Sequence, residues 1–162
     1  MRKKQLHFTD QVEFNVIVKQ VQKRLKGLVE SIHGTFYQDL KSGVIDLTIW
    51  NELDDQFAFQ ESLSIRAAAD LILLTDNGDA HTVIDDIYRE RNGHSIDPII
   101  TNRIYQEAIA QYERTSGTKP VVSKDTMVPE ITFPFKSLSE INGALEQMNL
   151  VYLILVRTTS QI

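Results

Sequence analysis

The sequence predicts an α+β domain in which a three-stranded antiparallel meander and a C-terminal β-α-β unit form one sheet. Apolar residues recur at steps of three and four across 10–33, which is typical of an amphipathic helix. Short runs rich in aromatic and β-branched residues come next, and longer helical patterns that end at glycines follow them. The expected order is therefore one helix, three strands, three helices, and then strand, helix and strand.

The first helix is expected over 10–33, with Asp10 as its N-cap and Gly34 as its C-terminal stop. The segments between Gly34 and the second helix predict an antiparallel meander, because turn-forming residues separate them. These strands are expected at 35–40, 44–50 and 56–62.

Three helices are then expected, at 62–78, 80–92 and 97–117. The alanine run at 67–69 favours the first of them, and its apolar residues on every side predict that it is buried. Asp97 and Pro98 are a favourable cap and first-turn pair for the third. The segment 116–130 is interpreted as an exposed loop.

The C-terminal part predicts a strand, a helix and a second strand. Pro134 places the strand EITFPF towards a sheet edge, because proline lacks the backbone N–H that a central strand needs. Ser137 and Glu140 have the spacing of a capping box and predict a helix start. The run LVYLILVRT is interpreted as a central strand that is buried on both faces.

Composition and charge limit the possible function. The chain has 162 residues and no cysteine, which fits one globular domain, rules out cysteine-based sites and favours a cytoplasmic location. Its most apolar run is too short to cross a membrane. The net charge is −5, yet residues 1–26 hold seven basic and two acidic side chains. An acidic body does not attract nucleic acid as a whole, whereas the basic first segment could meet phosphate or an acidic partner.

One motif resembles a known family of enzymes. A helix, three antiparallel strands and another helix, together with the segment SGVIDL, resemble the opening of the PD-(D/E)XK nucleases across residues 10–76. The resemblance implies a divalent cation held by two carboxylates, with Asp46 as the first and Glu61 as the second. The position of the family's lysine falls on Leu63.

Strand register tests this resemblance, because a shift of one residue moves a side chain to the other face of the sheet. If Trp50 pairs with Gln56, Ile45 meets Glu61 and the apolar residues share one face. Asp46 then lies on the face opposite Glu61. Since burying each apolar side chain contributes about 1.5–3 kcal/mol, this register is expected over the one that pairs the two carboxylates.

The neighbouring hairpin offers a second pair of carboxylates. Aligning its apolar residues brings Asp39 opposite Asp46, and a bound divalent cation would relieve the repulsion between them. An exposed sheet face, or a different turn length, would leave the two carboxylates without a shared ligand.

The preferred hypothesis is a non-enzymatic cytoplasmic domain with a protein-interaction or regulatory role, which needs no cofactor. Its partner would be another protein or a second copy of the chain. Lys19, Lys23 and Lys26 are the candidate binding residues, because they lie off the apolar stripe of the first helix. The alternative is a metal-dependent nuclease, or a degenerate relative, that uses Asp46 with Glu61 or Asp39.

Overall fold

A single six-stranded antiparallel sheet organises the chain in the computed structural model, which describes residues 10–54, 57–68, 71–117, 120–122 and 129–162. The strand order is β1-β2-β3-β4-β6-β5, so β1 to β4 form a four-stranded meander. The elements are α1 (Gln11–Arg24), β1 (Ser31–Tyr37), β2 (Ser42–Asp54), β3 (Phe57–Ala68), β4 (Leu71–Asp76), α2 (Asp79–Asn92), α3 (Pro98–Ser116), β5 (Val121–Val122), β6 (Ile131–Phe135), a 3-10 turn η1 (Leu138–Glu140) and α4 (Ile141–Ser160).

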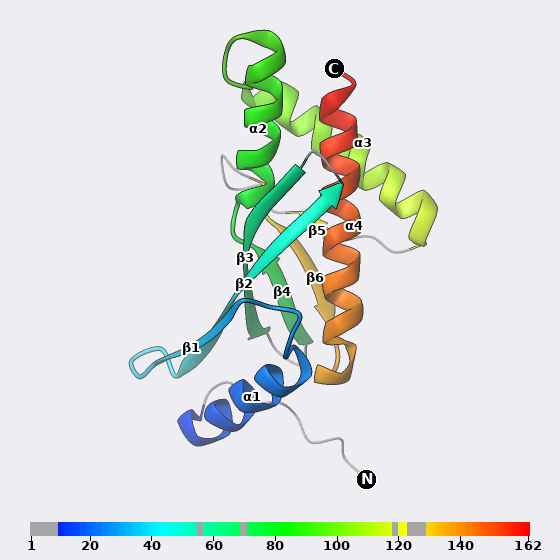
Figure 1. Cartoon of the computed structure of the whole chain (residues 1–162). Coiled ribbons are helices and arrows are strands. Elements are labelled where there is room, and N and C mark those ends of the chain that lie inside the picture. Colours follow the sequence, from blue (N-terminus) through cyan, green and yellow to red (C-terminus); the bar gives the residue numbers. More distant parts are fainter. Residues whose placement is uncertain (1–9, 55–56, 69–70, 118–119, 123–128) are drawn as a thin grey trace.

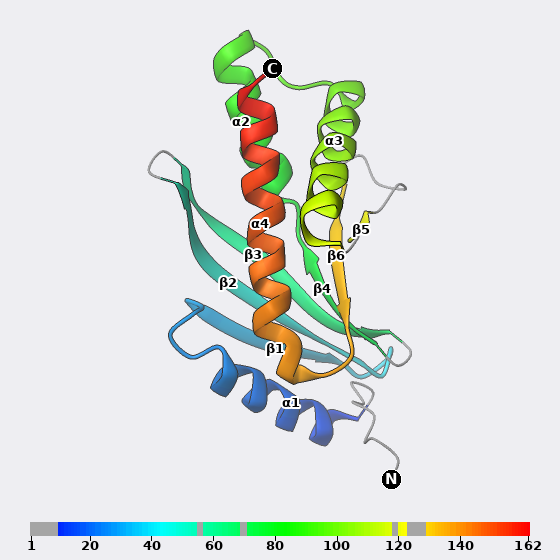
Figure 2. The same cartoon turned by 90° about the vertical axis from the view of Figure 1, so that its right-hand side faces the viewer.

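The described helices gather on one face of this sheet (Figures 1 and 2). The long helix α4 crosses the sheet, α2 and α3 pack against α4, and α1 packs against β1 and β2. We call this the inner face, and its strand residues, such as Ile45, Leu47, Leu63 and Ile65, are buried. The outer face carries the alternate side chains, including Asp46 and Arg66, which are exposed.

The helix starts that capping chemistry predicted are confirmed. Asp10 accepts hydrogen bonds from the backbone N–H groups of Val12 and Glu13, at 2.8 and 3.0 Å. Asp97 caps α3 in the same way, with Pro98 in its first turn. The capping box of Ser137 and Glu140 is present and opens η1, from which α4 continues.

Two glycines let α1 pack close to the sheet. A Cβ atom on Gly43 would lie 2.3 Å from the ring of Phe14, and one on Gly34 would lie 2.6 Å from Val18. Because both glycines belong to the inner face of the first hairpin, the ring of Phe14 packs directly against the backbone of β1 and β2. The first helix is also shorter than expected, because it ends at Arg24 and the chain then turns back to form β1. Gly34 lies inside β1 rather than at a helix end.

The helix expected at 62–78 is wrong. Ser62 to Ala68 continue β3, and Leu71 to Asp76 form β4, which pairs antiparallel with β3. The sequence alternates Leu63, Ile65 and Ala67 with polar residues, which is a period of two. Burial of that alternating face therefore outweighed the helix propensity of the alanines.

The central strand expected at 150–158 is also wrong. These residues belong to the second half of α4, and the β-α-β unit becomes a strand followed by one long helix. α4 packs against the sheet and against both α2 and α3, and every residue from 150 to 156 is apolar, so its helical period is hidden. Neither glycine nor proline separates it from the helix that was expected before it.

The helices expected at 80–92 and 97–117 are confirmed as α2 and α3, and EITFPF is confirmed as β6. Pro134 lies beyond the two residues of β6 that pair with β5, next to the sheet edge. The segment expected as the loop 116–130 contains the short strand β5, and residues 118–119 and 123–128 lie outside the described part. Among the described residues, no helix combines the length and apolar character needed to cross a membrane.

Candidate functional site

Asp46 and Glu61 lie on opposite faces of the sheet. In the observed register, Ile49 pairs with Glu61 and Asp46 pairs with Ser64, so the expected pairing of Ile45 with Glu61 is displaced by four residues. An even displacement preserves the faces. Asp46 is exposed on the outer face, whereas Glu61 is fully buried on the inner one. These two carboxylates therefore cannot bind a common cation in this fold.

Asp39 does not lie opposite Asp46 either. The residue that pairs with Asp46 across the first hairpin is His33, because β1 ends at Tyr37 and Asp39 falls in the turn that follows. The expected alignment assumed a longer first strand and a shorter turn. The fourth strand that replaces the expected helix also removes the order of elements on which the nuclease resemblance rested.

The register instead brings His33, Asp46 and Ser64 into one row across β1, β2 and β3 on the outer face. The hydroxyl of Ser64 donates to Asn77 Oδ1 at 2.8 Å and lies 3.3 Å from Asp46 Oδ1. A nucleophilic triad needs the imidazole between the serine and the acid. Here the acid lies in the middle, so the row does not activate Ser64.

A polar cluster lies within the core on the inner face. Asp76, at the end of β4, accepts hydrogen bonds from the hydroxyl of Tyr152 on α4 and from the backbone N–H of Gly78. Glu61 on β3 and Tyr105 on α3 are also buried. Within the described part of the chain, the other carboxylate oxygen of Asp76 and the hydroxyl of Tyr105 make no hydrogen bond. Four elements, β3, β4, α3 and α4, thus contribute to a cluster around one acid that has no exposed surface.

Burial is the main influence on the ionisation of this cluster. Desolvation raises the pKa of Asp76 to about 6, although the hydrogen bonds from Tyr152 and Gly78 act in the opposite direction. Desolvation also raises the pKa of Tyr152 and that of Tyr105, with the charge of Asp76 adding to both. Such values occur in active sites and in buried structural networks alike, so access to the cluster decides between them.

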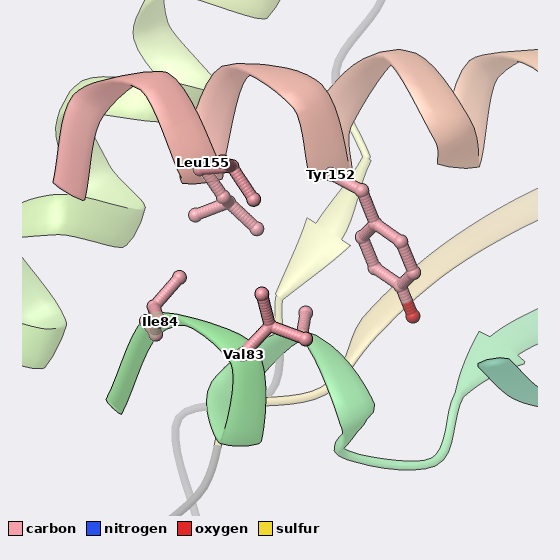
Figure 3. Close-up of a pocket in the computed structure, with 6 residues that line it drawn as sticks. Val83, Ile84, Tyr152 and Leu155 are labelled. Atoms are coloured by element: carbon pink, nitrogen blue, oxygen red, sulfur yellow. The ribbon is translucent and has the colours of Figure 1, made fainter. Parts of the chain in front are cut away.

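Access is closed on the side that Figure 3 shows. A depression between α2 and α4 is lined by Ala80, Val83, Ile84, Tyr152, Leu155 and Val156, and it has no room for a water molecule. The aliphatic side chains fill it, and the hydroxyl of Tyr152 points away from them (Figure 3). The cluster is therefore a structural feature of the core, and a substrate cannot reach it through this depression.

The outer side of α1 combines exposed apolar and basic side chains. Val12 and Val16 are 73% and 51% exposed, and Lys19 and Lys23 are also exposed. At 100° per residue these four lie within about 60° of one another, opposite the buried Phe14, Ile17 and Val21. We call this set the outer stripe. Lys26 is exposed as well, but it follows the end of α1 and lies outside the stripe.

The lysines of the outer stripe have no ionic partner within the described chain. The salt bridges among the described residues join Arg89 to Asp85 and Asp86 on α2. The lysines were found from the sequence because they fall between the apolar positions of the first helix. The valines were missed because the sequence does not show which valines of a helix are exposed. That depends on which face of the helix packs against the sheet.

Comparison of the chain with models of protein families, with curated proteins and with solved structures gave no match. Among the described residues, no group of three or more potential metal ligands comes together. The outer stripe of α1 is therefore the candidate site on which a functional proposal can be built from the geometry alone.

Proposed function

We propose that this chain is a non-enzymatic protein-interaction domain, and that the outer stripe of α1 binds an acidic surface of another protein. The observation that carries the proposal is the exposure of two valines beside two lysines on the side of α1 that faces away from the core. An apolar pair flanked by basic residues suits a protein surface that offers both apolar area and carboxylates. A cytoplasmic location is part of the proposal, because the chain has no cysteine.

Phosphate is a poorer partner than a protein for this surface. The backbone of nucleic acid offers charge at every step and would gain nothing from Val12 and Val16, while the rest of the chain is acidic and repels it. A second copy of the chain remains a competing partner, and analytical ultracentrifugation at several concentrations distinguishes it from a different protein.

The proposal is tested by affinity capture from the native host, read by quantitative mass spectrometry. The variant K19E/K23E reverses the charge of the stripe. It is expected to capture about ten-fold less of a specific acidic partner than the unchanged protein does, because like charges across an interface repel. The matched control is R103E/R114E, which makes the same change of charge on the exposed side of α3. Equal loss with both variants, or no loss with K19E/K23E, would contradict the proposal.

A metal-dependent hydrolytic function has a simple check. Magnesium, manganese and calcium would each raise the melting temperature if Asp46 shared a cation, and Asp46→Asn would abolish that response. We expect no such response, because neither Glu61 nor Asp39 lies beside Asp46 on the outer face.

A further inference from the structure

The outer stripe has a direction. Along α1 the exposed apolar residues come first, at Val12 and Val16, and the lysines follow at Lys19 and Lys23. From first to last the stripe covers eleven residue steps, which is roughly 16 Å or three helical turns. A matching surface must therefore be apolar at one end and acidic at the other.

The repeat of the stripe favours a helix as its counterpart. Its members are three or four residues apart, so they advance by roughly 4.5 to 6 Å at each step. A facing helix presents side chains at the same spacing. Side chains on one face of an extended strand advance by nearly 7 Å and would lose register with the stripe after the second contact.

Copies and segments of this chain itself fit the stripe poorly. Two α1 helices packed in parallel would bring lysine against lysine, and packed antiparallel they would bring lysine against valine. The segment before α1, MRKKQLHFT, carries Arg2, Lys3 and Lys4 and no acidic residue. Neither can supply carboxylates to Lys19 and Lys23, which favours a different protein as the occupant.

Helix dipoles then set the orientation. Carboxylates are most favourable in the first turns of a helix, where the partial charge is positive. An antiparallel partner would place its first turns beside Lys19 and Lys23, near the C-terminal end of α1. We infer that the partner contributes an acidic amphipathic helix of about three turns, which lies antiparallel to α1 with carboxylates in its first turns and aliphatic residues in its later ones. This inference rests on the proposed function of the stripe.

Two synthetic peptides of identical composition test the inference with the whole 162-residue chain. The acid-first peptide carries its glutamates in the first two turns and its leucines, at helical spacing, in the last two, and the acid-last peptide reverses this order. Fluorescence anisotropy at low salt, where screening is weak, is expected to show about ten-fold tighter binding of the acid-first peptide. K19Q/K23Q should remove that preference, whereas R103Q/R114Q should retain it.

Each other outcome overturns the inference. Equal binding of the two peptides, tighter binding of the acid-last peptide, or no binding of either would show that the partner is not the helix inferred. Binding to phosphatidylserine vesicles that is lost in K19Q/K23Q would assign the stripe to a lipid surface instead. The capture experiment separates this failure from that of the proposed function, because an acidic partner that K19E/K23E loses would still support the function.

Discussion

Among single residues, Asp76 is an acid that the fold holds in an unfavourable environment. Its carboxyl group is buried, and its pKa is raised from the model-peptide value of 3.8 to about 6. Between these two values the folded protein binds more protons than the unfolded chain does. The free energy of unfolding that Asp76 contributes is therefore highest below pH 3.8 and falls as the pH rises through about 6.

The substitution Asp76→Asn isolates this effect. Relative to the variant, the wild-type protein should be more stable at pH 4 than at pH 7, by about 2 kcal/mol. Urea denaturation of both proteins across this range measures the difference, because contributions from the other acids largely cancel. A difference that does not change with pH, or one of opposite sign, would show that Asp76 is not desolvated in the folded state.

Two tyrosines in the same cluster should respond differently to loss of the hydroxyl group. Tyr152→Phe removes the donor to Asp76 and should lower the free energy of unfolding at pH 7 by about 1–3 kcal/mol. Tyr105→Phe removes a buried hydroxyl that makes no hydrogen bond to the described residues, and its effect should be close to neutral or stabilising. Chemical denaturation compares them directly. Equal losses would mean that Tyr105 has a partner that the packing does not reveal.

At the scale of elements, the fit of α1 onto the first hairpin depends on Gly43. Gly43→Ala would push a methyl group into the ring of Phe14 and should cost about 1–3 kcal/mol. Gly143 on α4 has open space around it, so Gly143→Ala should stabilise the protein by about 0.5–1 kcal/mol. Thermal unfolding measures both, and hydrogen exchange should show faster exchange in α1 of the Gly43 variant alone. Matching effects at the two glycines would contradict the close packing.

The helices that could be predicted from the sequence are those with explicit end signals. Asp10, Asp97 and the pair Ser137 and Glu140 mark helix starts through local hydrogen bonds, which need no knowledge of the rest of the fold. The second half of α4 carries no such signal, because apolar residues such as Leu150 and Leu153 also occupy its less buried side and remove the polar face that reveals a helix. Without a polar face, residues 150–158 resemble a buried strand, which is why the sequence predicts one there.

The site was predictable only in part, for the same kind of reason. Lys19 and Lys23 could be placed on an exposed face from the helical period alone. The burial of Asp76 required the pairing of β3 with β4, where the local sequence favoured a helix. Pairing between strands is set by contacts far apart in the chain, and the local pattern of residues left its register open.

At the scale of the whole molecule, the fold separates a covered face from an open one, and the charge of the chain differs between its first 26 residues and the remainder. The described helices pack on the inner face of the sheet, and α1 lies at one end of the molecule (Figure 2). The residues of its outer stripe lie opposite the side that is buried against the sheet. The basic first segment and the acidic remainder of the chain make α1 electrostatically distinct from the body that carries it.

Site-specific photo-crosslinking in the native host tests most directly whether the outer stripe is the surface that binds the partner protein. A photoreactive residue in place of Val16 should give a crosslinked product with one acidic protein. The matched control places it at Ile99, an apolar residue of α3 that is 82% exposed, where the same product should be absent. A product of equal strength from both positions, or none from position 16, would contradict the account.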